Sequence, residues 1–372
     1  MYLPTTINSS MVRNINELPL ELLEVSLTLV GSDWYCMLSM TCNLWISILV
    51  SCRERSKRSV IRHTDLYVWS RGYDLQLTAK ICSNVASYGN LNVLKWVREN
   101  GCPWDAWTCR KAAGNGHLAM LRWAHENGCP WDEGICAAAA ANGHLAILQW
   151  ARANGCLWGT WTCMSAASNG HLEVLQWARA NGCPWDTDTC ACAAENGDLA
   201  TLQWARANGC PWDEDTCTNA AANGDLAILQ WARANGCPWD ENTCSYAVYS
   251  EDLHILQWAR ANGCPWNENT CSTAANYGEL AFLQWARANG CPWNENTCTA
   301  AGCGGHLAVL QWARANGCPW GTWTSESIAS SGYLEILQWA LANGCPWNSN
   351  LVKFSAKRVV EWTVANGYST TA

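Results

Sequence analysis

The chain has 372 residues, of which 15% are charged, and its formal net charge is −8. A broadly acidic chain lacks the basic surface that nucleic acids require, so we expect no nucleic-acid partner. The chain has no run of about 18 apolar residues and no apolar signal core at its start, which predicts no membrane partner and no secretion. In a cytoplasmic or nuclear protein, the 24 cysteines are expected to be small buried apolar residues.

Residues 1–14 are expected to be a flexible N-terminus, and residues 15–52 to be two or three short helices. Pro19 lies at the start of the first helix, and Gly31–Asp33 separates it from the next. The order LPxELL, a spaced Leu, an Asp and CxxW resembles the F-box family. The matching residues are Leu18, Pro19, Glu21, Leu22, Leu23, Leu29, Asp33, Cys42 and Trp45.

The F-box resemblance implies a partner for this segment. An F-box docks its apolar helices onto a Skp-type adaptor of a cullin–RING ubiquitin ligase. The residues that the resemblance assigns to adaptor binding are Leu18, Pro19, Glu21, Leu22, Leu23, Leu29 and Trp45. Ser26 departs from the family, which has an Ile there. The alternative is that residues 15–52 are only a helical cap that covers the first repeat.

Residues 53–78 contain a short basic linker and a degenerate half-repeat, and residues 79–348 contain ten copies of one 27-residue unit. The glycine of each copy's turn marks the period from Gly101 to Gly344 without a slip. Residues 349–372 are a truncated capping copy. Regular units with irregular ends predict a stacked solenoid, because its terminal units have to face water.

Each unit is predicted to be two short antiparallel helices and a tight turn. In the copy at residues 213–239, Asp215 or Thr216 is expected to cap a first helix that ends at Asn223–Gly224. Asp225 caps the second helix, which ends at Asn235–Gly236 before a proline. We therefore expect an all-α solenoid of about ten to eleven helix pairs.

The unit "AAANGDLAILQWARANGCPWD" resembles the ankyrin repeat. The alanine pair Ala220–Ala221, the inter-helix Gly224 and the apolar Leu226, Ile228 and Leu229 match the family pattern. The unit is six residues shorter than the usual 33, and the part it lacks is the β-hairpin tip. The resemblance implies an ankyrin-like, protein-binding solenoid whose recognition surface lies mainly on its first helices.

Trp, Arg and Cys recur in columns along the array. Two Trp columns, which begin at Trp96 and Trp104, are predicted to be core. An Arg column stands where ankyrin repeats place a Leu, and acidic pairs such as Asp213–Glu214 are its expected partners. The two Cys columns contain no CxxC, which indicates no zinc site. A metal-responsive protein that uses these cysteines is the weakest of three hypotheses.

No catalytic constellation or phosphate loop stands out from the repeat, so we expect no enzyme, no cofactor and no metal. Constant positions hold the stack, and positions that differ between copies are predicted to contact a partner. These positions are Trp107, Arg110, Lys111, Met164, Glu195, Tyr246, Tyr249 and Asn276. The copy at residues 240–266 departs most from the pattern, since Glu251 replaces its glycine, and the partner is expected at this middle region.

The first hypothesis is a monomeric substrate receptor. Residues 15–52 would bind a Skp-type adaptor, and the solenoid would bind an unidentified target protein. Chains with this order of segments resemble the F-box/ankyrin proteins of large DNA viruses and their protist hosts, which implies the host cytoplasm for a viral protein. The alternative is a scaffold or sequestering protein with no role in ubiquitination, whose N-terminal helices are a cap.

Overall fold

The computed structural model describes residues 78–347 and 357–368. Every regular element in these ranges is a helix, and ten consecutive helix pairs are followed by the single helix α26 (Lys357–Ala365). The prediction of an all-α solenoid of about ten to eleven helix pairs is confirmed. Residues 15–52, with the predicted adaptor-binding residues, lie outside the described residues. The predicted domain limits stay predictions.

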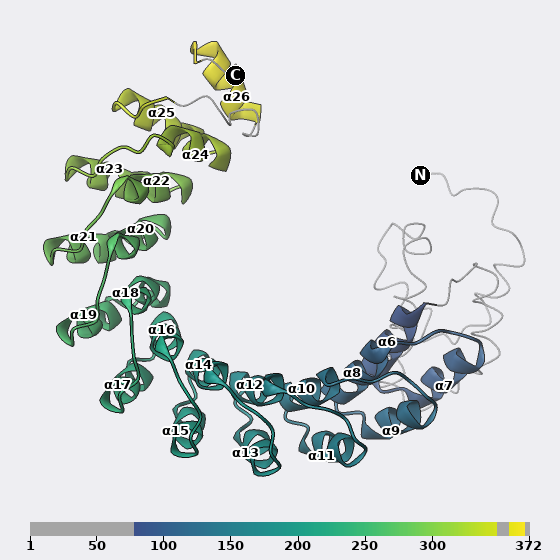
Figure 1. Ribbon diagram of the computed structural model, residues 1–372. Coiled ribbons are helices and arrows are strands. Elements are labelled where there is room, and N and C mark those ends of the chain that lie inside the picture. Colours follow the sequence, from purple (N-terminus) through teal and green to yellow (C-terminus); the bar gives the residue numbers. More distant parts are fainter. Residues whose placement is uncertain (1–77, 348–356, 369–372) are drawn as a thin grey trace, which may run out of the picture. The chain divides into compact units, whose positions relative to one another are not determined.

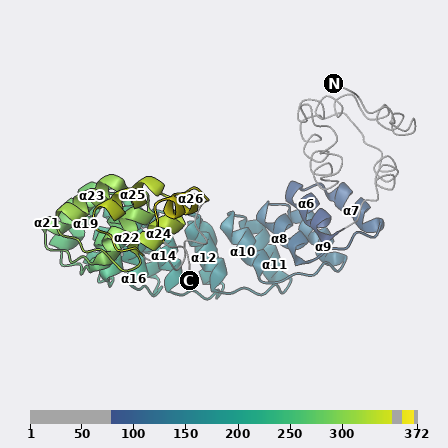
Figure 2. The same ribbon diagram turned by 90° about the horizontal axis from the view of Figure 1, so that it is seen from above.

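The chain divides after Pro184 into two compact units. The described helices of the first unit are α6 (Ala79–Tyr88), α7 (Leu91–Glu99), α8 (Ala106–Gly114), α9 (Leu118–Glu126), α10 (Gly134–Ala141), α11 (Leu145–Ala153), α12 (Thr160–Ser168) and α13 (Leu172–Ala180). Figure 2 shows how these helix pairs follow one another in a row.

The second unit begins at Trp185. Its described helices, besides α26, are α14 (Thr187–Glu195), α15 (Leu199–Ala207), α16 (Glu214–Ala222), α17 (Leu226–Ala234), α18 (Glu241–Tyr246), the 3-10 helix η1 (Ala247–Ser250), α19 (Leu253–Ala261), α20 (Glu268–Asn276), α21 (Leu280–Ala288), α22 (Glu295–Cys303), α23 (Leu307–Ala315), α24 (Thr324–Ser331) and α25 (Leu334–Ala342). In each unit the first helices of the pairs form one layer and the second helices form another (Figure 1).

The core lies between these two layers. In the copy at residues 213–239, α16 buries Thr216, Cys217, Ala220 and Ala221, and α17 buries Ile228, Leu229 and Ala232. First helices pack directly on the first helices of neighbouring repeats, for example α16 on α14 and α18. Small side chains allow this, because packed interiors leave no space for bulk where two helices approach closely.

Helix limits follow local signals, with one correction. The N-cap of α16 is Asp213, not the predicted Asp215 or Thr216. Asp213 is the last residue with extended backbone, whereas Asp215 already lies in the first helical turn. The side chain of Asp225 caps α17 as predicted, since its Oδ1 accepts a hydrogen bond of 2.9 Å from the Ile228 amide.

The turn after each second helix has the hydrogen bonds of a Schellman motif. Gly236, at a φ of 84°, donates its amide to the Arg233 carbonyl, and Cys237 donates its amide to the Ala232 carbonyl. No atom lies within 4 Å of the position that a Cβ would occupy at Gly236. The left-handed backbone, rather than a lack of space, therefore requires glycine here.

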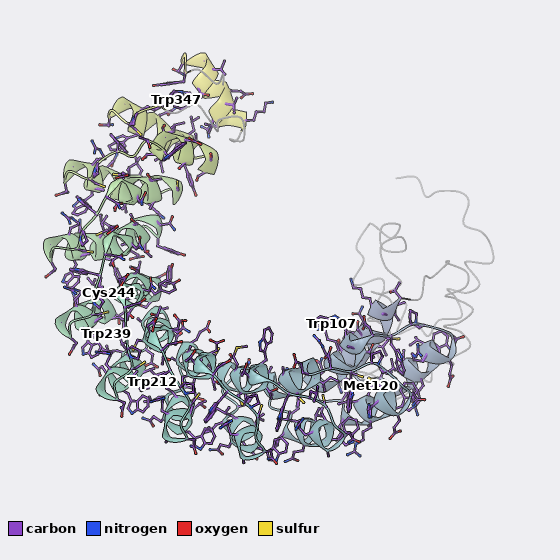
Figure 3. The ribbon with its side chains drawn as sticks, in the orientation of Figure 1. Trp107, Met120, Trp212, Trp239, Cys244 and Trp347 are labelled. Carbon is purple, nitrogen blue, oxygen red and sulfur yellow. The ribbon has the colours of Figure 1, made fainter. Side chains whose placement is uncertain are left out.

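The Trp columns form a half-buried ladder and not the fully buried core that the sequence predicts. From Trp104 to Trp320, each turn Trp meets the second-helix Trp of the next repeat edge to face, with ring centroids 5.9 Å apart for Trp212 and Trp231 and 6.0 Å apart for Trp239 and Trp258. All four rings are only partly buried. Trp212 and Trp239 lie in the connections between repeats (Figure 3), where they pack neighbouring pairs together.

The Arg column binds to this ladder and not to acidic side chains, so the predicted acidic partners are wrong. The Arg233 guanidinium lies 3.9 Å from the centroid of the Trp239 ring and donates a hydrogen bond to the Cys237 carbonyl. His125 replaces the arginine in one copy and stacks on Trp131 at 3.7 Å. A flat cation fits here because it can stack on the ring and still reach a carbonyl of the turn.

The Cys columns are buried and hydrogen-bonded. The Cys237 Sγ donates to the Asp213 carbonyl of the preceding turn at 3.3 Å, and equivalent cysteines repeat this contact. A hydrogen bond with Cys129, together with burial, raises the pKa of the Cys109 thiol, which therefore stays protonated. In the part of the chain that the structure describes, no group of three or more His, Cys, Asp or Glu could hold a metal ion.

Removing an arginine side chain from the Trp ladder is expected to destabilise the protein. Arg233→Ala removes one cation–π contact and one hydrogen bond to a carbonyl, which together should lower the free energy of unfolding by about 1–2 kcal/mol. Equilibrium urea unfolding of the full chain measures this. Gln230→Ala, at an exposed position of the same helix, is the control. Equal stability of the two variants would contradict a structural role for the Arg column.

Candidate functional site

The residues predicted to contact a partner all lie on or directly beside first helices. Trp107, Lys111, Glu195, Tyr246, Tyr249 and Asn276 are exposed, and Arg110 and Met164 are half-buried. The first unit contains four of the eight, on α8 and α12, and the second unit contains the other four. The structure brings only some of them together.

On α8, Trp107 and Arg110 form a small group. The Trp107 side chain is 55% exposed, and the Arg110 guanidinium lies 5.1 Å from its ring centroid. Arg110 also donates from Nε to the Asp132 carboxylate at 2.7 Å, and this bond lowers the pKa of Asp132. Arg110 therefore links α8 to the turn before α10, and only Trp107, seen in Figure 3, presents a large free apolar surface.

In the second unit, three tyrosines form a compact exposed group, the tyrosine cluster: Tyr246, Tyr249 and Tyr277. Tyr246 is the last residue of α18, Tyr249 lies in η1, and Tyr277 is the C-cap of α20. The ring centroids of Tyr246 and Tyr249 are 5.0 Å apart and those of Tyr249 and Tyr277 are 4.8 Å apart, both edge to face. The three residues are 41%, 40% and 53% exposed. Cys244, labelled in Figure 3, marks the buried side of the same helix α18.

Sequence reasoning found two members of the cluster and missed the third. Tyr246 and Tyr249 were predicted, but beside α20 the prediction was Asn276 and not its neighbour Tyr277. The missed signal is the repeat position of Tyr277, which is an asparagine in five earlier copies, namely Asn115, Asn142, Asn169, Asn196 and Asn223. Tyr88 occupies the same position at the end of α6.

The backbone beside the cluster is strained. Among the described residues, Glu251 is the one non-glycine residue with a positive φ, 57°, at a position where other copies have glycine. A left-handed backbone costs about 1–2 kcal/mol for a residue that carries a Cβ. Here α18 ends at Tyr246 and is followed directly by η1, in which Tyr249 lies against Tyr277. Strain at an exposed aromatic group is a recognised sign of a functional site.

The surroundings of the cluster are negative. Burial and the neighbouring Tyr277 raise the pKa of Tyr249, so its hydroxyl stays neutral. Glu251 follows η1 and Glu279 follows α20 within two residues of Tyr277, and neither has an ion pair among the described residues. The cluster also sits at helix C-termini, which carry a partial negative charge.

No arginine or lysine between Trp185 and Trp347 forms an ion pair that offsets this charge. Between Trp185 and Trp347 the sequence has 17 Asp and Glu, five Arg and no Lys. Each of the five arginines lies over a turn Trp in the second-helix layer; they are Arg206, Arg233, Arg260, Arg287 and Arg314. The first-helix surface of this region is therefore acidic.

The opposite ends of the first helices are acidic too. Burial and the carboxylates of Asp213, Glu214, Asp240 and Asp188 raise the pKa of Asp215. Acidic residues in a first helical turn are favourable beside the helix dipole, which accounts for their recurrence in α14, α16, α18, α20 and α22. We assign these residues to helix stability, except Asp215, whose burial and neighbouring carboxylates outweigh the favourable helix dipole.

Comparison with known proteins gives likenesses of fold only. No family model and no curated protein matches the chain. A solved structure of the pentatricopeptide repeat protein PPR10 with an 18-nt psaJ RNA element has a TM-score of 0.40 and 15% identity over 97% of this chain. This chain spans 63% of that one. PPR10 from maize gives a TM-score of 0.36 and 13% identity, over 93% of this chain and 65% of that one.

The ankyrin repeat domain of human ASB11 matches with a TM-score of 0.36 and 16% identity, over 42% of this chain and 84% of that domain. All three structures are helical-repeat proteins, and a helical-repeat solenoid is what this chain shares with them. The F-box and viral resemblances find no support in these comparisons.

Two expectations about partners are corrected. The exclusion of nucleic acid from composition alone is wrong, because a structure of similar fold is a repeat protein bound to an RNA element. The expected Skp-type adaptor has no support, and its predicted residues lie outside the described ranges. In those ranges, no helix is long and apolar enough to cross a membrane.

The strain at Glu251 predicts a stabilising substitution. Glu251→Gly should raise the free energy of unfolding by about 1 kcal/mol, since glycine adopts a positive φ without a steric penalty. Urea unfolding of the full chain measures the change. Glu268→Gly, in the first turn of α20, should instead be destabilising. A Glu251→Gly variant less stable than the wild type would show that the side chain, not the backbone, determines the local structure.

The raised pKa of Asp215 predicts a pH-dependent effect. A carboxyl whose pKa is higher in the folded state disfavours folding once it ionises, so its cost appears as pH rises above about 4. Asp215→Asn should therefore stabilise the protein at pH 7, by up to about 0.5 kcal/mol for an exposed group, and not at pH 3. Thermal unfolding at both pH values measures this. If Asp215→Asn increased the stability of the protein equally at pH 3, charge repulsion would be excluded as the cause.

Proposed function

We propose that the solenoid is a non-enzymatic binding module that recognises a partner protein through its first-helix face, with the tyrosine cluster as the centre of the contact. The assembly of three exposed rings from two neighbouring repeats carries this proposal. The repeated side chains of Trp, Arg and Cys are occupied in holding the stack, and the cluster is not required by the repeat.

Tyrosine suits this role. It has a large apolar surface with a polar end, and it is enriched among the residues that contribute most to binding between proteins. The rings of the cluster already pack against one another, so a partner would meet side chains that have lost much of their freedom. Preorganised contacts cost less entropy on binding.

Delivery of the bound protein to a ubiquitin ligase stays a prediction from the F-box resemblance. A scaffold or sequestering protein with the same solenoid is the alternative. The proposal above concerns the solenoid and holds for either.

The proposal predicts that selected ligands depend on the cluster. Peptides would be selected from a displayed random library on the full-length protein, and their affinities would be measured for wild type and for Tyr246→Leu/Tyr249→Leu/Tyr277→Leu. Loss of the rings should weaken binding about tenfold or more. The outcome that contradicts the proposal is a set of peptides that binds both proteins equally, or no selected peptide at all.

Tyr88→Leu is the matched control, since Tyr88 has the repeat position of Tyr277 in the first described helix. It should leave the affinities unchanged. Urea unfolding of each variant shows whether the stack is intact.

A further inference from the structure

We infer that the tyrosine cluster is a cation-binding site that takes an arginine or lysine side chain from an extended segment of the partner protein. This inference rests on the proposed function and specifies the chemistry of the ligand.

The first observation is the arrangement of the rings. Tyr246 packs edge to face on Tyr249, and Tyr249 on Tyr277, and the three residues stay 40–53% exposed. The negative face of an aromatic ring attracts a guanidinium or ammonium group. The protein makes the same contact internally, where the arginines of its second helices lie 3.9–4.4 Å from Trp ring centroids.

The second observation is the charge around the rings. Glu251 and Glu279 follow η1 and α20 in the sequence and have no ion pair in the described ranges, and Tyr249 and Tyr277 lie at the C-terminal ends of η1 and α20. His254 is the nearest basic side chain in sequence, and it bonds to Asp252. Arginine and lysine are absent from the first helices between Trp185 and Trp347, so these helices supply no such cation to the rings.

The third observation is a second carboxylate at a defined distance. Glu195 is exposed at the end of α14, where it has the repeat position that Tyr249 has two copies later. At helix spacings of about 8–10 Å, two repeats are about 20 Å apart, which about six extended residues span. A partner segment that places one cation on the rings can therefore place another, about six residues away, on Glu195.

The test uses labelled peptides in a Gly/Ser background with the full-length protein. One peptide has two arginines about six residues apart, a second has a single arginine, and a third has citrulline in place of both arginines. Binding is measured by fluorescence polarisation at about 50 mM and about 300 mM salt, because screening weakens contacts that depend on charge alone.

The two-arginine peptide should bind the wild type at least tenfold more tightly than the citrulline peptide. Tyr249→Leu/Tyr277→Leu should lower its affinity about tenfold, whereas Tyr249→Phe/Tyr277→Phe, which keeps the ring faces, and the control Tyr88→Leu should change it less than twofold. Glu195→Gln should weaken the two-arginine peptide two- to threefold and leave the single-arginine peptide unchanged.

Four results would overturn the inference. Equal binding of the citrulline peptide would exclude a cation, and binding that survives loss of the rings would assign the peptide to the acidic surface alone. Preferential binding of a labelled uridine oligonucleotide at the cluster, lost with the tyrosines, would assign the rings to base stacking. If library peptides depend on the tyrosines but contain no excess of Arg or Lys, the inference fails while the proposed function stands.

Discussion

Every repeat of this protein depends on burying one face of a helix pair against the next repeat. A pair of nine-residue helices has no interior of its own, so the alanine, cysteine and threonine side chains of α16 are covered only because α14 and α18 pack on either side. The same dependence explains the constancy of the unit. A change at a stacking position disturbs two interfaces at once, so 27-residue copies stay nearly identical over the array.

At the surface of the second-helix layer, Trp and Arg side chains also join neighbouring repeats. Two Trp side chains per interface meet edge to face, and an arginine covers one of them while it also bonds to a carbonyl of the turn. The arrangement uses aromatic and cationic groups for structure, and it leaves every arginine between Trp185 and Trp347 engaged. An acidic first-helix surface is a direct result, and the tyrosine cluster stands out against it.

The repeat at residues 240–266 departs from the regular pattern of helix pairs at η1 and Glu251, beside the tyrosine cluster. Glu251 holds a backbone that suits glycine, and the first helix changes to a 3-10 turn that places Tyr249 against a tyrosine of the next copy. Local strain and an exposed aromatic group occur at the same place, and this coincidence supports the proposed contact.

The sequence by itself determined the period, the helix pairs and the turns, because Gly236, Pro238 and the capping Asp225 act through local backbone geometry. It also identified Tyr246 and Tyr249 as positions that differ between copies. Only the tertiary structure decided what the columns touch. Arg233 finds a ring six residues along the chain and not an acidic pair, and the Trp rings stay half exposed. Tyr277 joins the cluster from the next repeat, since contacts between copies depend on stacking geometry that no single unit contains.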